Sequence, residues 1–537
     1  MMALLLSKSS TDNIATRLWN DWRRAATIHT DFIQSFEMTM KLVAPERLGS
    51  FGGSIRQDYD QIWDSTAVEA AQSLVDTLVA GIMPPWSPWF MLVPGEVVTG
   101  DDRKVIGDLL AAVNRTLLIE LNVTNIVKEA QAAFLDLMCG SADLMVKPRK
   151  DGRGVAFKCQ PIEQIKVLRE SDGSVTHIFR EFEYSAAELL RFFRDKLPQI
   201  AIAELEEDIT RIYRVVEATV LDAGSPIEDP QWMRFLLTDL SGSASGVASV
   251  TDIGPLILEQ EDLDFNPHHV INWAPVPNSP YGRGPATMAY GDIRSLNKTK
   301  ELLLKNMWKQ VAGVYTYKPD GIFNPKTMRP RPGAFIPVGS TSTQEPTIAP
   351  LPFSSDIGAA QIGIADLRES IRAMFLSGSF SPVQGTKMSA TEIVTRSREL
   401  ADRLGATYAG IVNDLLIPII EKTIRILAKQ KRIPEQIKLD RSVVDVVFLA
   451  QLAQAQRLQE VDSMLQFAQF AQLLTQGDPS QAILDPVKFQ RRIAELLAVD
   501  SRLLKSDAEL EQQAQRLAQA QAQTQQAAPV AAPGGIQ

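Results

Sequence analysis

The sequence predicts an α+β protein that is mainly helical. Apolar residues recur at the three- and four-residue spacing of amphipathic helices over long stretches of the chain. Shorter alternating segments, bounded by Gly- and Pro-rich turns, interrupt these stretches and are expected to form strands. The chain has 537 residues, of which 45% are hydrophobic and 22% charged. It is therefore an ordinary globular protein, long enough for about two to four domains.

The N-terminal half is expected to begin with helices. Residues 10–45 predict the first, and Thr66-Ala-Val-Glu69 is a capping box that predicts a second helix ending near Gly81. Residues 101–147 are expected to contain two more helices. Three alternating segments then predict strands, and a Gly- and Ser-rich stretch predicts a hairpin loop or a surface excursion. These segments are 155–183, 210–221 and 231–239, and the stretch is 241–254.

A predicted helix at 292–311 has two chemically opposite faces. Four basic side chains fall within roughly 60° of one another, and five apolar side chains lie on the other side. The basic residues are Arg294, Lys298, Lys305 and Lys309, and the apolar residues are Ile293, Leu296, Leu303, Met307 and Val311. The turn Tyr281-Gly-Arg-Gly-Pro285 precedes this helix, and Pro285 suits a first helical turn. A basic stripe on a helix is often only a solvated face. Whether this one binds a partner must therefore be judged from the neighbouring sequence.

This stripe lies in the most basic part of an acidic chain. Residues 286–355 contain nine Lys or Arg and four Asp or Glu, whereas the whole chain has a formal charge of −9. Four of these cations, Lys318, Lys326, Arg329 and Arg331, follow the helix. The negative overall charge does not predict a protein that binds nucleic acid tightly. The basic segment is nevertheless expected to contact a different partner from the one that the rest of the chain contacts.

A small β-containing module is expected after this helix. Pro and Gly are dense between 319 and 352, where the β-prone run 334–338 lies, and a second such run at 313–317 precedes them. A helix is expected at 356–376 and a loop at 377–388. The arrangement predicts two helices flanking a short β module.

The C-terminal third is expected to be helical. A capping box, Ser389-Ala-Thr-Glu392, starts a long helix whose apolar seam is made of Ile393, Leu400, Leu404, Ile411 and Leu415. Pro418 should kink this helix, which is expected to continue to Leu427. Further helices are expected at 446–475 and 486–498. From about Ala508 the chain is rich in Gln and Ala and is expected to be frayed or disordered.

The sequence offers no recognisable catalytic or metal site. It lacks the P-loop, the Gly-rich dinucleotide turn and the paired-histidine zinc motif. Of the histidines, only the adjacent pair His268 and His269 is a candidate for metal binding. Side chains of adjacent residues point to different sides of the backbone, so a shared metal ion is not expected. Cys139 and Cys159 are too few for a disulfide scaffold and wrongly spaced for a metal. We therefore expect a protein that is not an enzyme and holds no metal or cofactor.

Neither a membrane span nor a signal peptide is expected. The sequence has no run of about eighteen uncharged apolar residues, and its N-terminal apolar run is short. A soluble protein made in a cytoplasm, with reduced cysteines, is the expectation.

Three segments, taken in order, carry a resemblance to a known family. They are Asp64-Ser-Thr-Ala through Pro84-Pro-Trp-Ser-Pro-Trp-Phe90, then Tyr281-Gly-Arg-Gly-Pro through Asp292-Ile-Arg-Ser-Leu-Asn297, then Met388-Ser-Ala-Thr-Glu-Ile393 through Leu415-Leu-Ile-Pro418. Together they resemble the portal proteins, the head-to-tail connectors of short-tailed, podovirus-type bacteriophages. Each segment is degenerate alone, but length and order match over nearly the whole chain, apart from the extreme C-terminus.

The resemblance implies a portal-protein fold with wing, stem, clip and crown, assembled as a ring around a central channel. Its parts would be 1–285 the wing, 286–312 the first stem helix, 313–355 the clip, 356–376 the second stem helix, 377–388 the tunnel loop, 389–432 a long kinked helix of the wing, 433–504 the crown, and 505–537 a C-terminal barrel or a disordered tail. The implied DNA-channel residues are Gln384, Thr386 and Lys387. The implied basic face of stem and clip, for DNA or a partner, consists of Arg294, Lys298, Lys305, Lys309, Lys326, Arg329 and Arg331.

The implied function is mechanical. A ring of about twelve copies would sit at one capsid vertex of the virion, after assembly in the host cytoplasm with the major capsid protein and scaffold. Double-stranded DNA would pass through it during packaging and ejection, while a separate terminase supplies ATP hydrolysis and a tail adaptor docks. No membrane is involved. The alternatives are a tail adaptor or other minor structural virion protein, and an enzyme of unrecognised type such as a nuclease or ATPase subunit.

Overall fold

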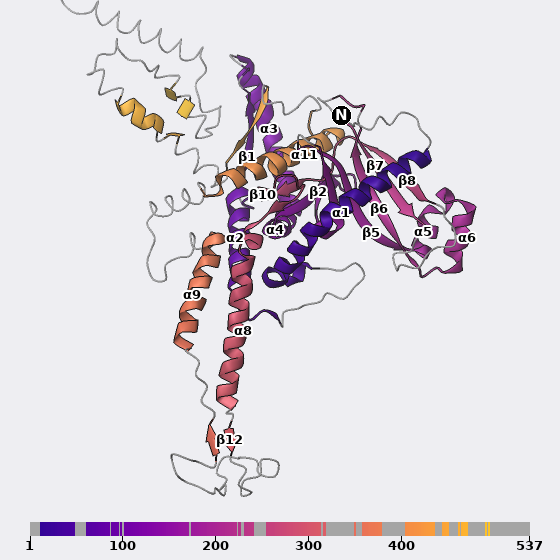
Figure 1. Cartoon of the computed structure of the whole chain (residues 1–537). Helices are drawn as coiled ribbons and strands as arrows, with labels where there is room; N and C mark the ends of the chain where they lie inside the picture. The colour runs from indigo at the N-terminus through magenta and orange to yellow at the C-terminus, as the bar shows by residue number, and fades with distance from the viewer. Residues whose placement is uncertain are drawn as a thin grey trace, which may run out of the picture.

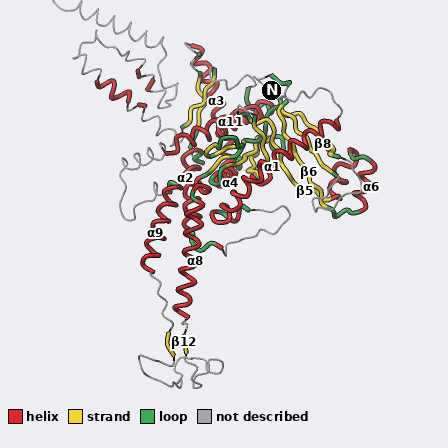
Figure 2. The backbone as a smooth tube through the Cα atoms, viewed as in Figure 1, coloured by secondary structure: helices red, strands yellow, loops and turns green. Residues whose placement is uncertain are grey.

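The chain is mainly helical, with several small sheets (Figures 1 and 2). The computed structural model describes residues 11–48, 61–240, 254–312, 315–317, 348–350, 357–377, 403–434, 443–449, 460–470 and 489–493, apart from positions 86, 96, 99–100, 171–172, 223, 227–229, 462 and 491. The helices are α1 (Thr11–Val43), α2 (Thr66–Ile82), α3 (Asp101–Val123), α4 (Ile126–Leu137), α5 (Ala186–Phe193), α6 (Gln199–Glu207), α7 (Pro285–Met288), α8 (Tyr290–Ala312), α9 (Ile357–Met374) and α11 (Ile417–Lys429). The strands are β1 (Phe90–Pro94), β2 (Ser141–Pro148), β3 (Val155–Gln160), β4 (Ile165–Arg169), β5 (Val175–Ser185), β6 (Ile212–Leu221), β7 (Trp232–Asp239), β8 (Pro255–Leu263), β9 (Val270–Asn272), β10 (Ala274–Pro275), β11 (Gly282–Arg283), β12 (Tyr315–Tyr317), β13 (Ile348–Pro350) and β14 (Val444–Phe448).

Two of the helix predictions are wrong in part. The prediction of helix through 147 fails because residues 141–148 form β2, which pairs with β3 and β9. Residues 141–146 are all buried, and a short, continuously buried run has no periodicity that separates strand from helix. The prediction of helix from 446 fails because β14 pairs with β1, with Phe448 opposite Phe90.

The capping box predicted at the start of α2 is not formed. Thr66 is the first helical residue, and its backbone N–H donates to the Asp64 carboxylate at 3.0 Å. The side chain of Glu69 accepts a hydrogen bond from the Ser65 hydroxyl at 2.8 Å instead of reaching back to a backbone N–H. The sequence signal located the helix start correctly and chose the wrong capping residue.

A five-stranded antiparallel meander, β4-β5-β6-β7-β8, is covered on both faces. Side chains alternate along each strand, so Val216 faces α1 with its Trp19 and Trp22, whereas Val215 and Leu236 face α5 and α6. All three predicted strand segments are confirmed. β7 and β8 pair directly, and residues 241–253 of the stretch predicted as a hairpin loop or surface excursion lie outside those described.

The main core lies between the three-stranded sheet and the helices around it. It joins residues of α2, α3, α4, α11 and the body ends of α8 and α9 into one apolar cluster. The described part of the predicted seam, Leu404, Ile411 and Leu415, is fully buried in this cluster, so it packs within the chain's own core. Ile393 and Leu400 lie outside the described residues.

A π-helical turn lies just before Pro418, where a kink was predicted. Residues Val412–Leu416 are π-helical, and α11 follows with Pro418 in its first turn, continuing to Lys429. Proline has no N–H to donate to the turn before it, and a wider turn accommodates the missing bond. The helix therefore continues past Leu427, as predicted.

Among the described residues no helix is both long and apolar enough to cross a membrane.

The helices predicted at 292–311 and 356–376 are present as α8 and α9, which lie side by side and project from the body (Figure 1). At their far end β12 and β13 pair antiparallel, with Thr316 opposite Ala349. We call α8, α9 and this strand pair the stalk. The predicted β-prone run at 334–338 lies outside the described residues.

Candidate functional site

The stalk begins at a turn in which glycines allow the backbone to pack closely against the backbone of other segments. A Cβ on Gly284 would lie 2.0 Å from the carbonyl oxygen of Met138, and one on Gly282 would lie 2.7 Å from that of Ala274. This close approach allows the Ala286 N–H to donate to Met138 O at 3.0 Å, at the C-terminal end of α4. The predicted place of Pro285 in a first helical turn is confirmed, in the short helix α7.

Tyr281 anchors the same turn from inside the body. Its ring stacks on Phe32 of α1 with centroids 4.4 Å apart. Its hydroxyl donates to Ile165 O and accepts from the Val167 N–H, each at 3.2 Å. Burial raises the pKa of Tyr281, so the hydroxyl stays protonated and keeps its donor role. The turn is therefore fixed to both α1 and β4.

A polar junction joins the stalk to the N-terminus of α2. Asp64 accepts from Arg368 of α9 at 2.6 and 3.2 Å and, with its other oxygen, from the Thr66 N–H. The side-chain oxygen of Asn297 on α8 accepts from the Trp63 N–H at 2.7 Å, and its nitrogen donates to Gln61 O at 2.7 Å. One short segment of chain thus holds both stalk helices.

The helices of the stalk are also tied to each other near the junction. Ser370 of α9 donates its hydroxyl to the Asp292 carboxylate of α8 at 2.8 Å. Asp64, Asp292 and Asn297 lie in the segments that carry the family resemblance, but no sequence pattern predicted a role for them or for Arg368. No local periodicity signals a pairing between residues 304 positions apart. The only hint of this pairing in the sequence is the run of polar residues at the start of α2, a helix that is otherwise packed in the core.

The electrostatics of the junction favour a charged Asp64. Burial by itself would raise the pKa of Asp64, but hydrogen bonds from Arg368 and Thr66 outweigh it and hold the pKa below its usual value. A carboxyl whose folded-state pKa is depressed stabilises the fold above its unfolded pKa, and this stabilisation is lost as the pH falls through the folded pKa.

We expect Arg368→Met to lower the free energy of unfolding by about 2 kcal/mol at neutral pH, because the Asp64 carboxylate would lose a charged hydrogen-bond partner. The deficit should shrink as the pH falls below the ordinary Asp value of 3.8, where Asp64 becomes neutral in the parent as well. Urea unfolding at several pH values measures both effects. Arg372→Met, at an exposed position of α9 one turn away, should change stability by less than about 0.5 kcal/mol.

The predicted basic stripe of α8 is exposed. Arg294, Lys298, Lys305 and Lys309 all face solvent. Glu301 neutralises part of the stripe, since it pairs with Lys298 at 2.9 Å and with Lys305. Lys305 also lies 5.9 Å from the ring centroid of Trp63. The unbridged cations of the described stripe are therefore at its two ends, Arg294 near the body and Lys309 near the tip.

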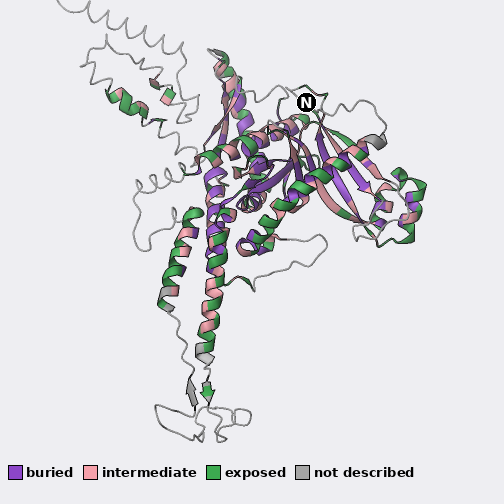
Figure 3. Cartoon of the chain, viewed as in Figure 1, coloured by how far each residue is buried: buried purple, intermediate pink, exposed green. Residues whose placement is uncertain are grey.

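The apolar face of α8 is covered only near the body. Ile293 and Leu296 are buried, but the expectation that Met307 packs on the same face is wrong, because it is exposed. Farther out, Leu302 and Trp308 on α8 and Ile362 on α9 are exposed as well, Trp308 to 77% and Ile362 to 74%. Figure 3 shows that the lower stalk extends beyond the body and that much of its described length is exposed. Large apolar side chains left uncovered on a projecting arm indicate a surface that meets something else.

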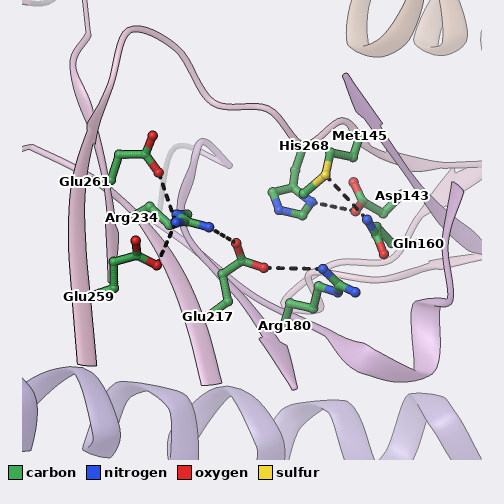
Figure 4. Close-up of polar contacts among 9 residues, drawn as sticks. All are labelled: Asp143, Met145, Gln160, Arg180, Glu217, Arg234, Glu259, Glu261 and His268. Carbon is green, nitrogen blue, oxygen red and sulfur yellow. Dashed lines mark hydrogen bonds and ion pairs between the residues drawn. The ribbon is translucent and has the colours of Figure 1, made fainter. Parts of the chain in front are cut away.

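The two histidines considered for a metal are used structurally. His268 contacts the buried Asp143 carboxylate at 2.6 Å, as Figure 4 shows, and His269 is held by the carbonyl oxygen of Leu144 at 2.7 Å. Burial lowers the pKa of His269 well below its usual value, so it is neutral. Within the described ranges, no cluster of three or more His, Cys, Asp or Glu side chains could hold a metal ion.

A network of charged side chains on the five-stranded sheet also has a structural role. Arg234 lies between Glu217, Glu259 and Glu261 at 3.0 to 3.2 Å, and Glu217 also pairs with Arg180 (Figure 4). These residues sit on adjacent strands, so the network ties β5, β6, β7 and β8 together. Both guanidinium groups of the network pair with carboxylates, although the buried Nε of Arg180 has no hydrogen-bond partner among the described residues.

The remaining predicted site residues lie outside the described residues. These are Gln384, Thr386 and Lys387 of the predicted loop, and Lys326, Arg329 and Arg331 of the predicted β module. The second capping box, at 389–392, and the Gln- and Ala-rich tail lie outside them too.

Comparison with known proteins identifies the family. The family model described as "Bacteriophage head to tail connecting protein" matches residues 15–504. The chain is 24% identical over 472 residues to a probable portal protein of Bordetella phage BPP-1, covering 83% of this chain and 80% of that protein. It is 23% identical to the portal protein of Enterobacteria phage T3, covering 83% and 79%, and 24% identical to that of Escherichia phage T7, covering 86% and 82%.

Among solved structures, a chain of the virion of a native gene transfer agent particle is similar, with a TM-score of 0.33 and 10% identity over 80% of this chain and 90% of that chain. A chain from the neck of an empty gene transfer agent particle has a TM-score of 0.32 and 11% identity, with the same coverage. The family match extends over most of the chain, including the body, the stalk and the junction between them. This protein belongs to the bacteriophage head-to-tail connecting protein family.

Proposed function

We propose that this chain is the portal protein of a short-tailed bacteriophage and that it acts as a ring at the head-to-tail junction of the virion. The structural observation that carries the proposal is the stalk, a projecting pair of helices whose outer apolar side chains find no cover within one copy. Family membership supplies the context, because the relatives that match most of the chain are portal proteins. The tail-adaptor alternative has no comparable support.

In this proposal the copies pack side by side around a central channel, about twelve of them. The proposed parts keep the expected ranges, with 1–285 as wing, 286–312 and 356–376 as stem helices, 313–355 as clip, 377–388 as tunnel loop, 389–432 as kinked helix, 433–504 as crown and 505–537 as barrel or tail. The lower stalk surfaces of neighbouring copies would cover one another. A head-to-tail contact of this kind uses two unlike surfaces on each copy, and the exposed faces of α8 and α9 supply them.

Double-stranded DNA is the proposed cargo. An acidic chain with few exposed cations in the channel would hold phosphates weakly, whereas many cations would give a tight, salt-dependent grip that stalls the duplex. We propose Gln384, Thr386 and Lys387 as channel residues, with a screened contact at each lysine worth less than about 1 kcal/mol. The proposed partners are a terminase that supplies the ATP hydrolysis, the major capsid protein and scaffold, and a tail adaptor at the clip.

The ring is tested by imaging the purified full-length protein. We expect class-averaged electron micrographs to show rings, and light scattering to give a single mass near twelve copies. A stable monomer at micromolar concentration under several salt conditions would contradict the proposal.

The stalk contact is tested in the same assay. Leu302→Asp combined with Trp308→Asp should abolish rings while leaving the melting temperature of the subunit nearly unchanged, since both side chains are exposed in one copy. Each lost apolar side chain would cost an interface about 1.5–3 kcal/mol. Ile200→Asp, at an equally exposed apolar position of α6, is the control and should leave rings intact.

A further inference from the structure

The turn between β2 and β3 carries exposed cations in an otherwise acidic chain. Lys150 and Arg153 lie in this turn, and both are exposed. Asp151 stands between them, but its carboxylate pairs with Arg149, 3.6 Å away. The turn therefore presents positive charge that its own carboxylate does not neutralise.

The two strands add Lys147 and Lys158 to the same surface. Lys158 is opposite Met145, two residues from Lys147, so both lysine side chains leave one face of the hairpin. The other face, with Val146 and Phe157, is buried in the core. Partial desolvation and the positive charge of Lys158 lower the pKa of Lys147, so the fold holds like charges close together here.

The C-terminal end of α11 extends this surface. Gln430 holds Gly154 through two hydrogen bonds, donating to its carbonyl oxygen at 3.1 Å and accepting from its N–H at 2.7 Å. Lys431 follows directly and is exposed. The helix end and the hairpin turn are therefore neighbours, and their cations form one surface, which we call the hairpin patch.

The composition of the hairpin patch fits phosphate groups. Among the described residues, five of its cations form no ion pair with a carboxylate, and they are Lys147, Lys150, Arg153, Lys158 and Lys431. Within residues 147–158 and 429–434 no large apolar side chain is exposed. Protein interfaces are depleted in lysine and have an apolar, aromatic core, whereas Lys and Arg are the usual contacts of nucleic-acid phosphates.

A duplex fits this surface better than a single strand. Proteins that bind single strands stack the bases on exposed aromatic side chains. The aromatic residue of the hairpin, Phe157, is buried on the opposite face. The patch is therefore suited to a backbone whose bases are already paired.

The hairpin patch is separate from the basic stripe of α8. Gln430 ties the patch to the end of α11, and α11 crosses the body on the side away from the projecting stalk (Figure 1). The stripe runs along the stalk itself. A ligand of one surface therefore does not occupy the other.

We propose that the hairpin patch binds the phosphate backbone of duplex DNA as a surface contact, which needs no DNA end to enter a channel. This contact goes beyond the proposed conduit, and it does not depend on ring formation, since its cations all belong to one copy.

Binding of a covalently closed DNA minicircle to the full-length protein tests the proposal, because a circle without ends cannot be threaded into a closed ring. The variant is Lys150→Gln with Arg153→Gln, two exposed cations of the turn. Arg191→Gln with Lys196→Gln is the matched control, since it removes one Lys and one Arg from exposed positions on and beside α5. Both double variants change the net charge equally.

We expect the turn variant to bind the minicircle roughly tenfold more weakly at about 0.1 M salt, and the control to bind like the parent. The slope of log affinity against log salt should become shallower by about 2 for each copy that contacts the DNA, since about 0.9 is lost with each phosphate contact. Melting temperatures of both variants should match the parent, because the altered side chains are exposed.

Lysine acylation of the parent protein gives a second measurement that needs no variant. Bound minicircle should protect Lys150 and Lys158 from acylation and leave Lys196 reactive. Equal binding by the turn variant and the parent, equal losses in the two variants, or an unprotected Lys150 would overturn the proposal. Polyglutamate of equal charge that binds as tightly as the minicircle, with the same loss in the turn variant, would overturn it in favour of an acidic protein. Micrographs of the same samples test the proposed ring separately, because the patch is complete in one copy.

Discussion

Gly284→Ala is expected to destabilise the protein by more than about 3 kcal/mol, which is a large part of the stability of an ordinary domain. The new Cβ would lie 2.0 Å from the Met138 carbonyl oxygen and 2.4 Å from its carbon, and backbone atoms cannot swing away as a flexible side chain can. The backbone of Gly284 is extended, with φ −104° and ψ 170°, a conformation that alanine adopts freely. The effect therefore isolates the close approach of the α7 turn to the end of α4.

The control is Gly291→Ala in the first turn of α8. A Cβ there meets nothing within 4 Å, so alanine should stabilise the helix by about 0.5–1 kcal/mol through its better helix propensity. Thermal and urea unfolding of both variants measures the difference. Similar stabilities of the two variants would show that the turn does not need the glycine. Loss of soluble protein for Gly284→Ala alone would agree with the expected direction.

Asp136→Ala should produce the second large loss, about 3 kcal/mol, because it leaves the Arg47 guanidinium, whose side chain is only 25% exposed, without its counter-charge. Arg47, just after α1, donates from Nε to Asp136 at 2.8 Å and from a terminal nitrogen to the other carboxylate oxygen. Burial raises the pKa of the Asp136 carboxyl, and the contact with Arg47 opposes that rise. The pair joins the turn that follows α1 to the last turn of α4, next in sequence to Leu137 and Met138, which the Gly284 turn contacts.

Two further variants show whether the lost charge balance is the cause. Arg47→Met combined with Asp136→Leu should recover most of the loss, since apolar groups of similar volume need no partner. Glu206→Ala removes the exposed pair with Arg194, which are 2.7 Å apart, and should cost no more than about 1 kcal/mol. A double variant as unstable as Asp136→Ala would indicate that shape, and not charge, governs this site.

Most of the helices could be predicted from the sequence because their signals are local. Apolar spacing located α1, α2, α8 and α9 to within a few residues, and Pro418 marked the interruption before α11. Strands β4 to β7 of the five-stranded sheet lie in segments that were predicted as strands, whereas β8 was not predicted. The buried run in β2 could not be assigned, because a strand covered on both faces has the same composition as a buried helix.

The junction could be predicted only in part. The segments that carry the family resemblance contain Asp64, Asp292 and Asn297, and the structure gives all three a partner from a distant part of the chain. The basic residues of α8 were placed on one exposed face correctly. Their partial neutralisation by Glu301 is local, since Glu301 lies three residues after Lys298 and four before Lys305, whereas the exposure of Met307 depends on where the body ends along the stalk.

The sequence by itself determined the position of most of the long helices, the opposite faces of α8, the turn before it, and the family to which the chain belongs. Each of these rests on residue spacing over a few turns or on an ordered set of short segments. The tertiary structure alone decided that residues 141–148 form a strand, that β14 pairs with β1, and that Asp64 binds Arg368. Those outcomes depend on which surfaces meet after the chain folds, and contacts between residues hundreds of positions apart leave no periodic signal in the sequence.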